Sequence, residues 1–81
     1  MIKLKLPSSY GDKLLNPSKY KYLTVDDNGE VYVYTKIPFY KSEKKIWNNP
    51  ADCHWQSIPG RVKSWSPVFR TTIFEIKWVN E

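Results

Sequence analysis

The chain has 81 residues and a net charge of +5, and 41% of its residues are hydrophobic and 16% aromatic. This length allows one small domain, which we expect over residues 1–81, and the apolar content excludes an intrinsically disordered chain. The longest apolar run is only a few residues, which predicts neither a signal peptide nor a membrane span. The expected location is therefore cytoplasmic.

The N-terminal segment reads as an edge strand. Residues 1–6 alternate lysine with isoleucine or leucine, a pattern typical of a half-exposed strand, and Pro7 ends it. Residues 8–18 are rich in turn-forming residues, and they predict at most one helical turn, around residues 12–15.

Residues 20–34 predict a β-hairpin, because two alternating runs flank the sequence Asp-Asp-Asn-Gly. A two-residue turn at Asn28-Gly29 would pair Val25 with Tyr32 and would mix aliphatic and aromatic side chains on both faces. A type I turn over residues 26–29, with Gly29 as a left-handed bulge, would instead pair Val25 with Val31. We favour the second register because it sorts the side chains by type. One face then holds Leu23, Val25, Val31 and Val33, and the other holds Tyr20, Tyr22, Thr24, Tyr32 and Tyr34.

The tyrosine face of this hairpin has two interpretations. It is either the second layer of a small core, covered by the tryptophan-containing segments, or an exposed aromatic surface for recognition. We expect a mixture of the two. Tyr22 and Tyr32 lie nearer the centre of the hairpin and are expected to pack, whereas Tyr20 and Tyr34 lie beside lysines and are expected to be available for contact.

The second half of the chain predicts further β structure. Residues 39–49 could open a short helix with Ser42 as its N-cap, or could form a twisted strand holding Ile46 and Trp47. Pro59-Gly60 predicts a turn between two short segments, of which the second contains Val62 and Trp65. Residues 69–79 are β-branched and aromatic and give the clearest single strand, with Phe74, Ile76 and Trp78 on one side.

Together these elements predict a mainly β fold, with α+β as the alternative. The expected architecture is a small antiparallel sheet of four to five strands, with a central β-hairpin and at most one short helix.

No arrangement of residues predicts catalysis, a metal site or a cofactor. His54 is the sole histidine, and its neighbour Cys53 would point to the opposite face of a strand, which makes a nucleophile-base pair geometrically poor. Asp52, Cys53 and His54 are contiguous and lack a spaced second pair of metal ligands. Asp26, Asp27 and Glu30 are too few for a calcium loop and suit turn chemistry instead. We therefore expect a protein that is not an enzyme.

The positive charge is unevenly distributed along the chain. Residues 1–25 carry five lysines and one aspartate, residues 26–35 carry three acidic residues and no lysine, and residues 36–50 carry four lysines and one glutamate. Lysines beside aromatic rings are suited to single-stranded nucleic acid, because bases stack on the rings and lysines follow the phosphates. A charge of this size also serves simply for solubility.

The hairpin resembles those of short accessory proteins of tailed phages and prophages. The resemblance implies a small protein made in the cytosol of an infected bacterium, within a group that includes inhibitors of host defence such as anti-restriction and anti-CRISPR proteins. Several of those proteins are acidic mimics of DNA, a pattern from which the charge of +5 departs. The residues that carry the resemblance are Tyr20, Tyr22, Leu23, Val25, Asp26, Gly29, Val31, Tyr32 and Tyr34, followed by Pro38 and Trp47.

Our leading hypothesis is a non-catalytic binding protein that occupies a site on a host protein or nucleoprotein complex. The alternative is a sequence-tolerant binder of single-stranded nucleic acid. Neither hypothesis involves a membrane or a cofactor, and the sequence does not indicate an oligomeric state. The candidate binding residues are Tyr20, Tyr34, Lys19, Lys21, Lys36, Lys41, Lys44 and Lys45.

Overall fold

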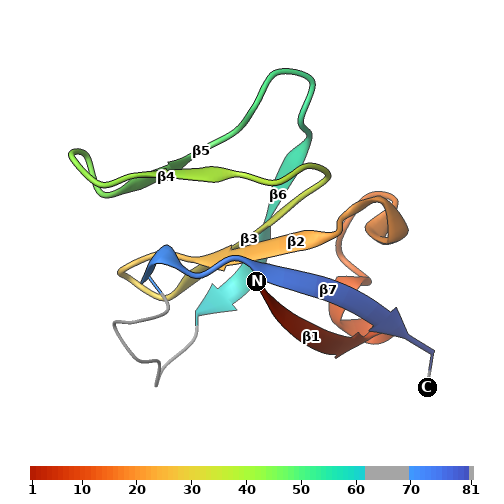
Figure 1. Cartoon of the computed structure of the whole chain (residues 1–81). Coiled ribbons are helices and arrows are strands. Elements are labelled where there is room, and N and C mark those ends of the chain that lie inside the picture. The colour runs from red at the N-terminus through yellow and green to blue at the C-terminus, as the bar shows by residue number, and fades with distance from the viewer. Residues whose placement is uncertain (62–69, 81) are drawn as a thin grey trace.

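A computed structural model describes residues 1–61 and 70–80, and in these ranges the chain is mainly β (Figure 1). Five strands form one sheet in the order β1-β7-β2-β3-β6, and β4 pairs with β5 in a separate hairpin. The short 3-10 turns η1 and η2 lie between β1 and β2, and residues 70 and 71 also have 3-10 helical structure. The elements are β1 (Ile2–Pro7), η1 (Ser8–Gly11), η2 (Pro17–Lys19), β2 (Tyr22–Val25), β3 (Glu30–Tyr34), β4 (Phe39–Lys41), β5 (Ile46–Asn48), β6 (Trp55–Arg61) and β7 (Phe74–Val79).

The expected class is confirmed, with one strand pair in a different direction. The pairs β2–β3, β2–β7, β3–β6 and β4–β5 are antiparallel, whereas β1 pairs with β7 in parallel. A parallel pair requires a long connection between its strands, and here almost the whole chain forms that connection. As expected, β1 lies at an edge of the sheet, where Lys3 and Lys5 are exposed.

The central hairpin has the register expected from side-chain sorting. Val25 pairs with Val31, and Leu23 pairs with Val33. The turn is closed by a bond of 2.9 Å from the Gly29 amide to the Asp26 carbonyl, and Gly29 has φ +84°. Glycine adopts this left-handed conformation without the steric cost that a Cβ atom would add, so the bulge at Gly29 sets the register.

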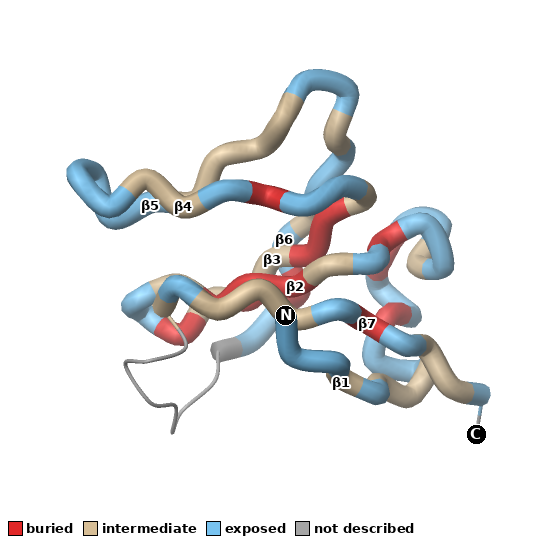
Figure 2. The backbone as a smooth tube through the Cα atoms, viewed as in Figure 1, coloured by how far each residue is buried: buried red, intermediate tan, exposed pale blue. Residues whose placement is uncertain are grey.

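The aliphatic face of the hairpin forms the core, and buried positions concentrate along β2 and β3 (Figure 2). Val33 is completely buried, and Leu4, Leu6, Phe74 and Trp78 pack against the core from the neighbouring strands. Phe74, Ile76 and Trp78 therefore share a face, as the alternation of residues 69–79 predicts. The core cluster consists of Leu14, Tyr20, Leu23, Val25, Val31, Val33, Ile58 and Ile76.

The helical turns of the structure lie at other places than the sequence predicts. Between β1 and β2, η1 and η2 flank residues 12–15 instead of including them, and Pro17 starts η2 because its fixed φ suits the first helical position. The short helix considered for residues 39–49 does not form, and the alternative strand is confirmed in β5. Tyr40 and Trp47 pair across β4 and β5 with their ring centroids 5.3 Å apart, which stabilises the hairpin over a helix.

The turn expected at Pro59-Gly60 is instead an irregularity within β6. The pairing register shifts between Glu30, which faces Arg61, and Val31, which faces Ile58. Gly60 has φ +102°, which accommodates the extra residues as a β-bulge without breaking the strand. The following segment with Val62 and Trp65, and also Phe69, lies outside the described residues.

Candidate functional site

The second face of the sheet carries aromatic side chains from two adjacent strands. Tyr34 pairs with Trp55 across β3 and β6, and Thr24 pairs with Tyr32 across β2 and β3. Directly paired residues project to the same side of a sheet. These rings therefore lie on the face opposite to the aliphatic core, below the β4–β5 hairpin, which forms a separate arm over the sheet (Figure 1).

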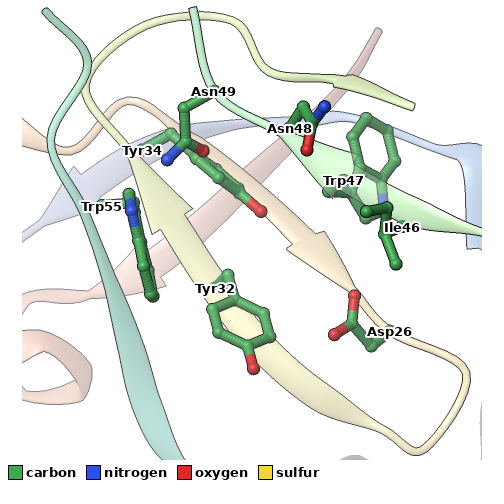
Figure 3. Close-up of a pocket in the computed structure, with 8 residues that line it drawn as sticks. All are labelled: Asp26, Tyr32, Tyr34, Ile46, Trp47, Asn48, Asn49 and Trp55. Carbon is green, nitrogen blue, oxygen red and sulfur yellow. The ribbon is translucent and has the colours of Figure 1, made fainter. Parts of the chain in front are cut away.

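A pocket of about 270 Å³ opens between this face and the β4–β5 arm (Figure 3). Side chains from β3 and β6 form one side of it, and side chains from β5 and the residues after β5 form the other. The Asp26 carboxylate, at the end of β2, points toward the same space (Figure 3). We call this the aromatic pocket, and its lining residues are Asp26, Tyr32, Tyr34, Ile46, Trp47, Asn48, Asn49 and Trp55.

Tyr34 forms the inner end of the aromatic pocket and is packed. Only 3% of its surface is exposed, and its hydroxyl lies 2.9 Å from the hydroxyl of the fully buried Thr24. Burial raises the pKa of Tyr34 to about 12. The ring is thus held in one position and presents only part of its edge to the pocket.

The outer wall consists of Tyr32 and Trp55. Their ring centroids are 5.8 Å apart with an interplanar angle of 60°, an edge-to-face arrangement, and Trp55 is 51% exposed. The Tyr32 hydroxyl donates a hydrogen bond of 2.6 Å to a Glu30 carboxylate oxygen, and this bond raises the pKa of Tyr32 to about 12. The outer wall is therefore accessible to solvent and fixed by a charged acceptor.

The opposite wall is anchored to the sheet through Arg70. The indole N–H of Trp47 donates to the Arg70 carbonyl at 3.2 Å, and the Arg70 Nε lies 2.6 Å from a carboxylate oxygen of Asp27. Trp47 also packs edge-to-face on Tyr40. Because Asp27 belongs to the β2–β3 turn, these contacts connect the β4–β5 arm to that turn.

The electrostatic character of the aromatic pocket is set by Asp26. Among the described residues, its lining includes this carboxylate and two amides, and no lysine, arginine or histidine. Burial, and then the negative charges of Glu30 and Asp27, raise the pKa of the Asp26 carboxyl. Lys41 reaches the rim, where its ammonium lies 3.0 Å from the Asn48 amide oxygen in the amide orientation that satisfies both groups. The Asp26 carboxylate therefore favours a neutral or cationic ligand group inside the aromatic pocket over an anionic one.

The structure corrects the expectation that Tyr20 and Tyr34 are available for contact. Tyr20 is 4% exposed and belongs to the aliphatic core cluster, where its hydroxyl accepts a hydrogen bond of 2.6 Å from the Gln56 amide. Tyr34 lies on the other face of the sheet. The two rings therefore do not form one surface, and the accessible rings of the pocket are the exposed Trp55 and the half-buried Tyr32 instead.

The candidate lysines are spread over three places. Lys19 and Lys21 flank Tyr20, Lys36 follows β3 and donates to the Ala51 carbonyl at 3.5 Å, and the other three lie on the β4–β5 hairpin. All are exposed except Lys41, which is half-buried. The structure thus brings together only the hairpin group of Lys41, Lys44 and Lys45.

Sequence reasoning missed the pocket although it considered most of its residues. Asp26 was interpreted as a turn former, and Trp47 and Trp55 as cover for the tyrosine face. The signal that could have found the site is the polar sequence Asn48-Asn49-Pro50, which ends a strand and is followed by a second tryptophan. Amides between two tryptophans are a usual composition for a binding pocket.

Other chemical sites are poorly supported by the geometry. Cys53 donates from its thiol to the backbone carbonyls of Lys36 and His54, at 3.8 and 3.5 Å, and His54 is exposed. Within residues 1–61 and 70–80, no three His, Cys, Asp or Glu side chains are grouped closely enough to hold a metal ion. In the same ranges, no helix has the length and apolarity needed to cross a membrane.

Comparison of the chain with protein-family models, with curated proteins and with solved structures gives no match. The function must therefore be inferred from the aromatic pocket and the surfaces around it.

Proposed function

We propose that this chain is a small non-catalytic binding protein, of the phage-accessory type, that acts by occupying a site on a host macromolecule. An anti-defence inhibitor is one form of this function. The observation that carries the proposal is the aromatic pocket, an accessible cavity with two tryptophans and two tyrosines in its walls. Aromatic rings in such pockets are the usual energetic centres of protein interfaces.

Exposed apolar side chains around the pocket support a protein partner. Ile46 at the rim is about as exposed as Trp55, and Ile37 before β4 and Phe39 at its start are similarly exposed. Large apolar groups around a pocket mark an interaction surface, whereas isolated ones need no explanation. The proposed contact surface is therefore the β4–β5 arm together with the mouth of the aromatic pocket.

A capture experiment tests this proposal. The tagged protein is incubated with nuclease-treated bacterial lysate, beside a Trp55→Ala variant and a Leu15→Ala control. Leu15 is 75% exposed and lies outside the pocket, so its replacement removes a comparable exposed apolar group elsewhere. We expect a protein that the wild type and the control capture and the Trp55→Ala variant loses, with unchanged far-UV circular dichroism. Equal capture by all three would refute the proposed surface.

Single-stranded nucleic acid is the second candidate, and one feature of the pairing register favours it. Lys3 pairs with Glu75, Lys5 pairs with Lys77, and Tyr22 also pairs with Glu75, so these lysines share the face that carries the tyrosines. Such a face could follow a phosphate backbone. The aromatic pocket itself argues against this candidate, because the charged group in its lining, as far as the chain is described, is the Asp26 carboxylate.

Salt dependence separates the two candidates. Binding to single-stranded nucleic acid should weaken steeply between about 50 and 200 mM salt, because each phosphate contact releases counterions. Binding centred on Trp55 should change far less over the same range. A fluorescence titration with a labelled oligonucleotide measures the binding of nucleic acid directly. It is repeated with a double variant that carries both Lys3→Gln and Lys5→Gln. A steep slope that the double variant reduces would support the nucleic-acid function.

A further inference from the structure

We propose that the aromatic pocket binds an organic cation, and specifically that it receives an arginine side chain of the partner protein. This inference deepens the proposed function and rests on it, because it names the group that the partner inserts. Three independent features of the pocket lead to it: the faces and edges of its rings, an unpaired carboxylate, and its size.

The rings provide a surface for a flat cation. A guanidinium or ammonium group within about 6 Å of a tryptophan or tyrosine ring is attracted by the negative face of the ring. Trp55 and Tyr32 form one wall and Trp47 the other, so a group between them contacts rings on two sides (Figure 3). Guanidinium is preferred to ammonium here because it is planar and less strongly hydrated.

The carboxylates at this end of the hairpin are unequally engaged. Asp27 pairs with Arg70, and Glu30 accepts the hydroxyl of Tyr32. The Asp26 carboxylate, in contrast, has neither a hydrogen bond nor an ion pair with any other residue in the described parts of the chain. A partly buried carboxylate loses some of its hydration, and an entering guanidinium would supply hydrogen bonds to both its oxygens.

The charge around the pocket opposes that of the rest of the protein. The chain as a whole carries +5, yet three carboxylates gather where β2 meets β3. Lys41 contacts the rim through Asn48 and is not among the lining residues. Within residues 1–61 and 70–80, the lining offers a phosphate or a carboxylate no cation to compensate for Asp26, whereas an entering cation would find a counter-charge.

The volume suits a single side chain. Pockets for small molecules and cofactors usually measure about 300–1,000 Å³, and this one measures about 270 Å³. One arginine side chain, entering between Trp55 and Ile46 from a partner surface, fills the space and leaves the partner's backbone outside.

Nuclear magnetic resonance with a small probe tests the pocket directly. The ¹⁵N-labelled protein is titrated with N-acetyl-arginine methylamide, and its indole and side-chain amide signals are followed. Parallel titrations use the lysine analogue and the citrulline analogue, which has the shape of arginine without its charge. We expect shifts at Trp47, Trp55, Asn48 and Asn49, and about tenfold weaker binding of the citrulline analogue.

Two variants with the same change in charge provide the control. Asp26→Asn removes the carboxylate of the pocket, and asparagine suits the first position of a type I turn, so the fold is retained. Asp52→Asn removes an exposed carboxylate outside the pocket, at a left-handed residue with φ +60° where asparagine is well tolerated. We expect Asp26→Asn to weaken binding of the arginine analogue about tenfold and Asp52→Asn to leave it unchanged.

Several results would overturn the inference. Equal binding of the arginine and citrulline analogues would show that charge is not recognised. Equal effects of Asp26→Asn and Asp52→Asn would show binding to the protein's acidic groups in general. In a further titration with a neutral sugar, shifts caused by the sugar and not by the arginine analogue would point to a carbohydrate site. Capture of a partner that depends on Trp55 but not on Asp26 would leave the proposed function standing and refute the arginine. Specific binding of the arginine analogue without any captured partner would leave the arginine site standing and refute the proposed function.

Discussion

The hydroxyl oxygens of Thr24 and Tyr34 lie 2.9 Å apart on neighbouring strands, and both residues are buried. Each hydroxyl can satisfy the other in a place where water has little access. This pair joins β2 to β3 on the face opposite the aliphatic core, so it stabilises the floor of the aromatic pocket without belonging to the core cluster.

We expect Tyr34→Phe to lower the free energy of unfolding by about 1–2 kcal/mol, because it leaves the Thr24 hydroxyl buried without its partner. Chemical denaturation measures the change. Combining Tyr34→Phe with Thr24→Val should cost less than the sum of the two single changes, since both polar groups are then removed. Tyr22→Phe is the matched control, because the described residues give no hydrogen-bond partner to the Tyr22 hydroxyl. Equal losses from Tyr34→Phe and Tyr22→Phe would contradict the assignment.

Stability should fall at high pH. The pKa values of Tyr32 and Tyr34 are raised to about 12 in the folded protein, whereas an unfolded tyrosine titrates near pH 10. The unfolded state therefore loses protons first as pH rises, and the contribution of these groups, complete below about pH 10, is lost as pH approaches 12. Denaturation midpoints between pH 8 and pH 12 test this. A decline that is equally steep in the Tyr34→Phe variant would exclude Tyr34 as a cause.

Gly29→Ala should destabilise the domain by about 1 kcal/mol or more, because alanine at φ +84° brings its Cβ atom into conflict with the backbone. Gly29→Asn should cost less, since asparagine adopts this conformation more readily. Thermal and chemical denaturation of the two variants provide the comparison. If alanine and asparagine cost the same, the effect would come from something other than the left-handed conformation.

Replacing Tyr20 and Tyr34 together by alanine should prevent stable folding. Truncation of a buried aromatic residue costs about 3–5 kcal/mol, and a small domain has only about 5–15 kcal/mol of stability in total. Tyr10→Ala is the control, because it removes a tyrosine that is exposed and should leave the domain folded. A cooperative thermal melt of the double variant near that of the wild type would show that these rings are not buried in solution.

Asp26→Asn should raise stability slightly at neutral pH. Burial and the neighbouring charges raise the pKa of this carboxyl, so the folded state favours its neutral form, and this contribution is present at low pH and lost as pH rises through the folded pKa. Because the group is largely accessible to solvent, the gain should be about 0.5 kcal/mol or less. The variant and the wild type should become equal in stability near pH 3. A loss of stability at pH 7 would indicate that the carboxylate has a structural partner.

The hairpin could be predicted in detail because its information is local. The alternation of Leu23, Val25, Val31 and Val33 and the position of Gly29 lie within a short stretch of sequence, and they determine register and faces together. Tyr20 was assigned to the wrong face because the same alternation was extended beyond the strand. The chain leaves the sheet at η2, just before Tyr20, so strand parity no longer applies there.

The aromatic pocket could not be predicted in the same way. Its walls come from segments that are separated along the chain, and the arm that closes it was ambiguous between helix and strand. The pairing of Tyr40 with Trp47 and the bond from Trp47 to Arg70 decide that ambiguity through tertiary contacts, which no local pattern records. Knowledge of which residues were aromatic was therefore insufficient to place them around one cavity.

The position of β7 has a consequence for how the protein acquires its structure. This strand lies between β1 and β2, so β1 contacts the sheet only through a strand that is synthesised much later. Contacts between residues so distant in sequence are slow to form, because the intervening chain must first be brought together. Until residues 74–79 have been synthesised, β1 has no neighbour and β2 has an open edge, so the sheet can be completed only after translation has passed them.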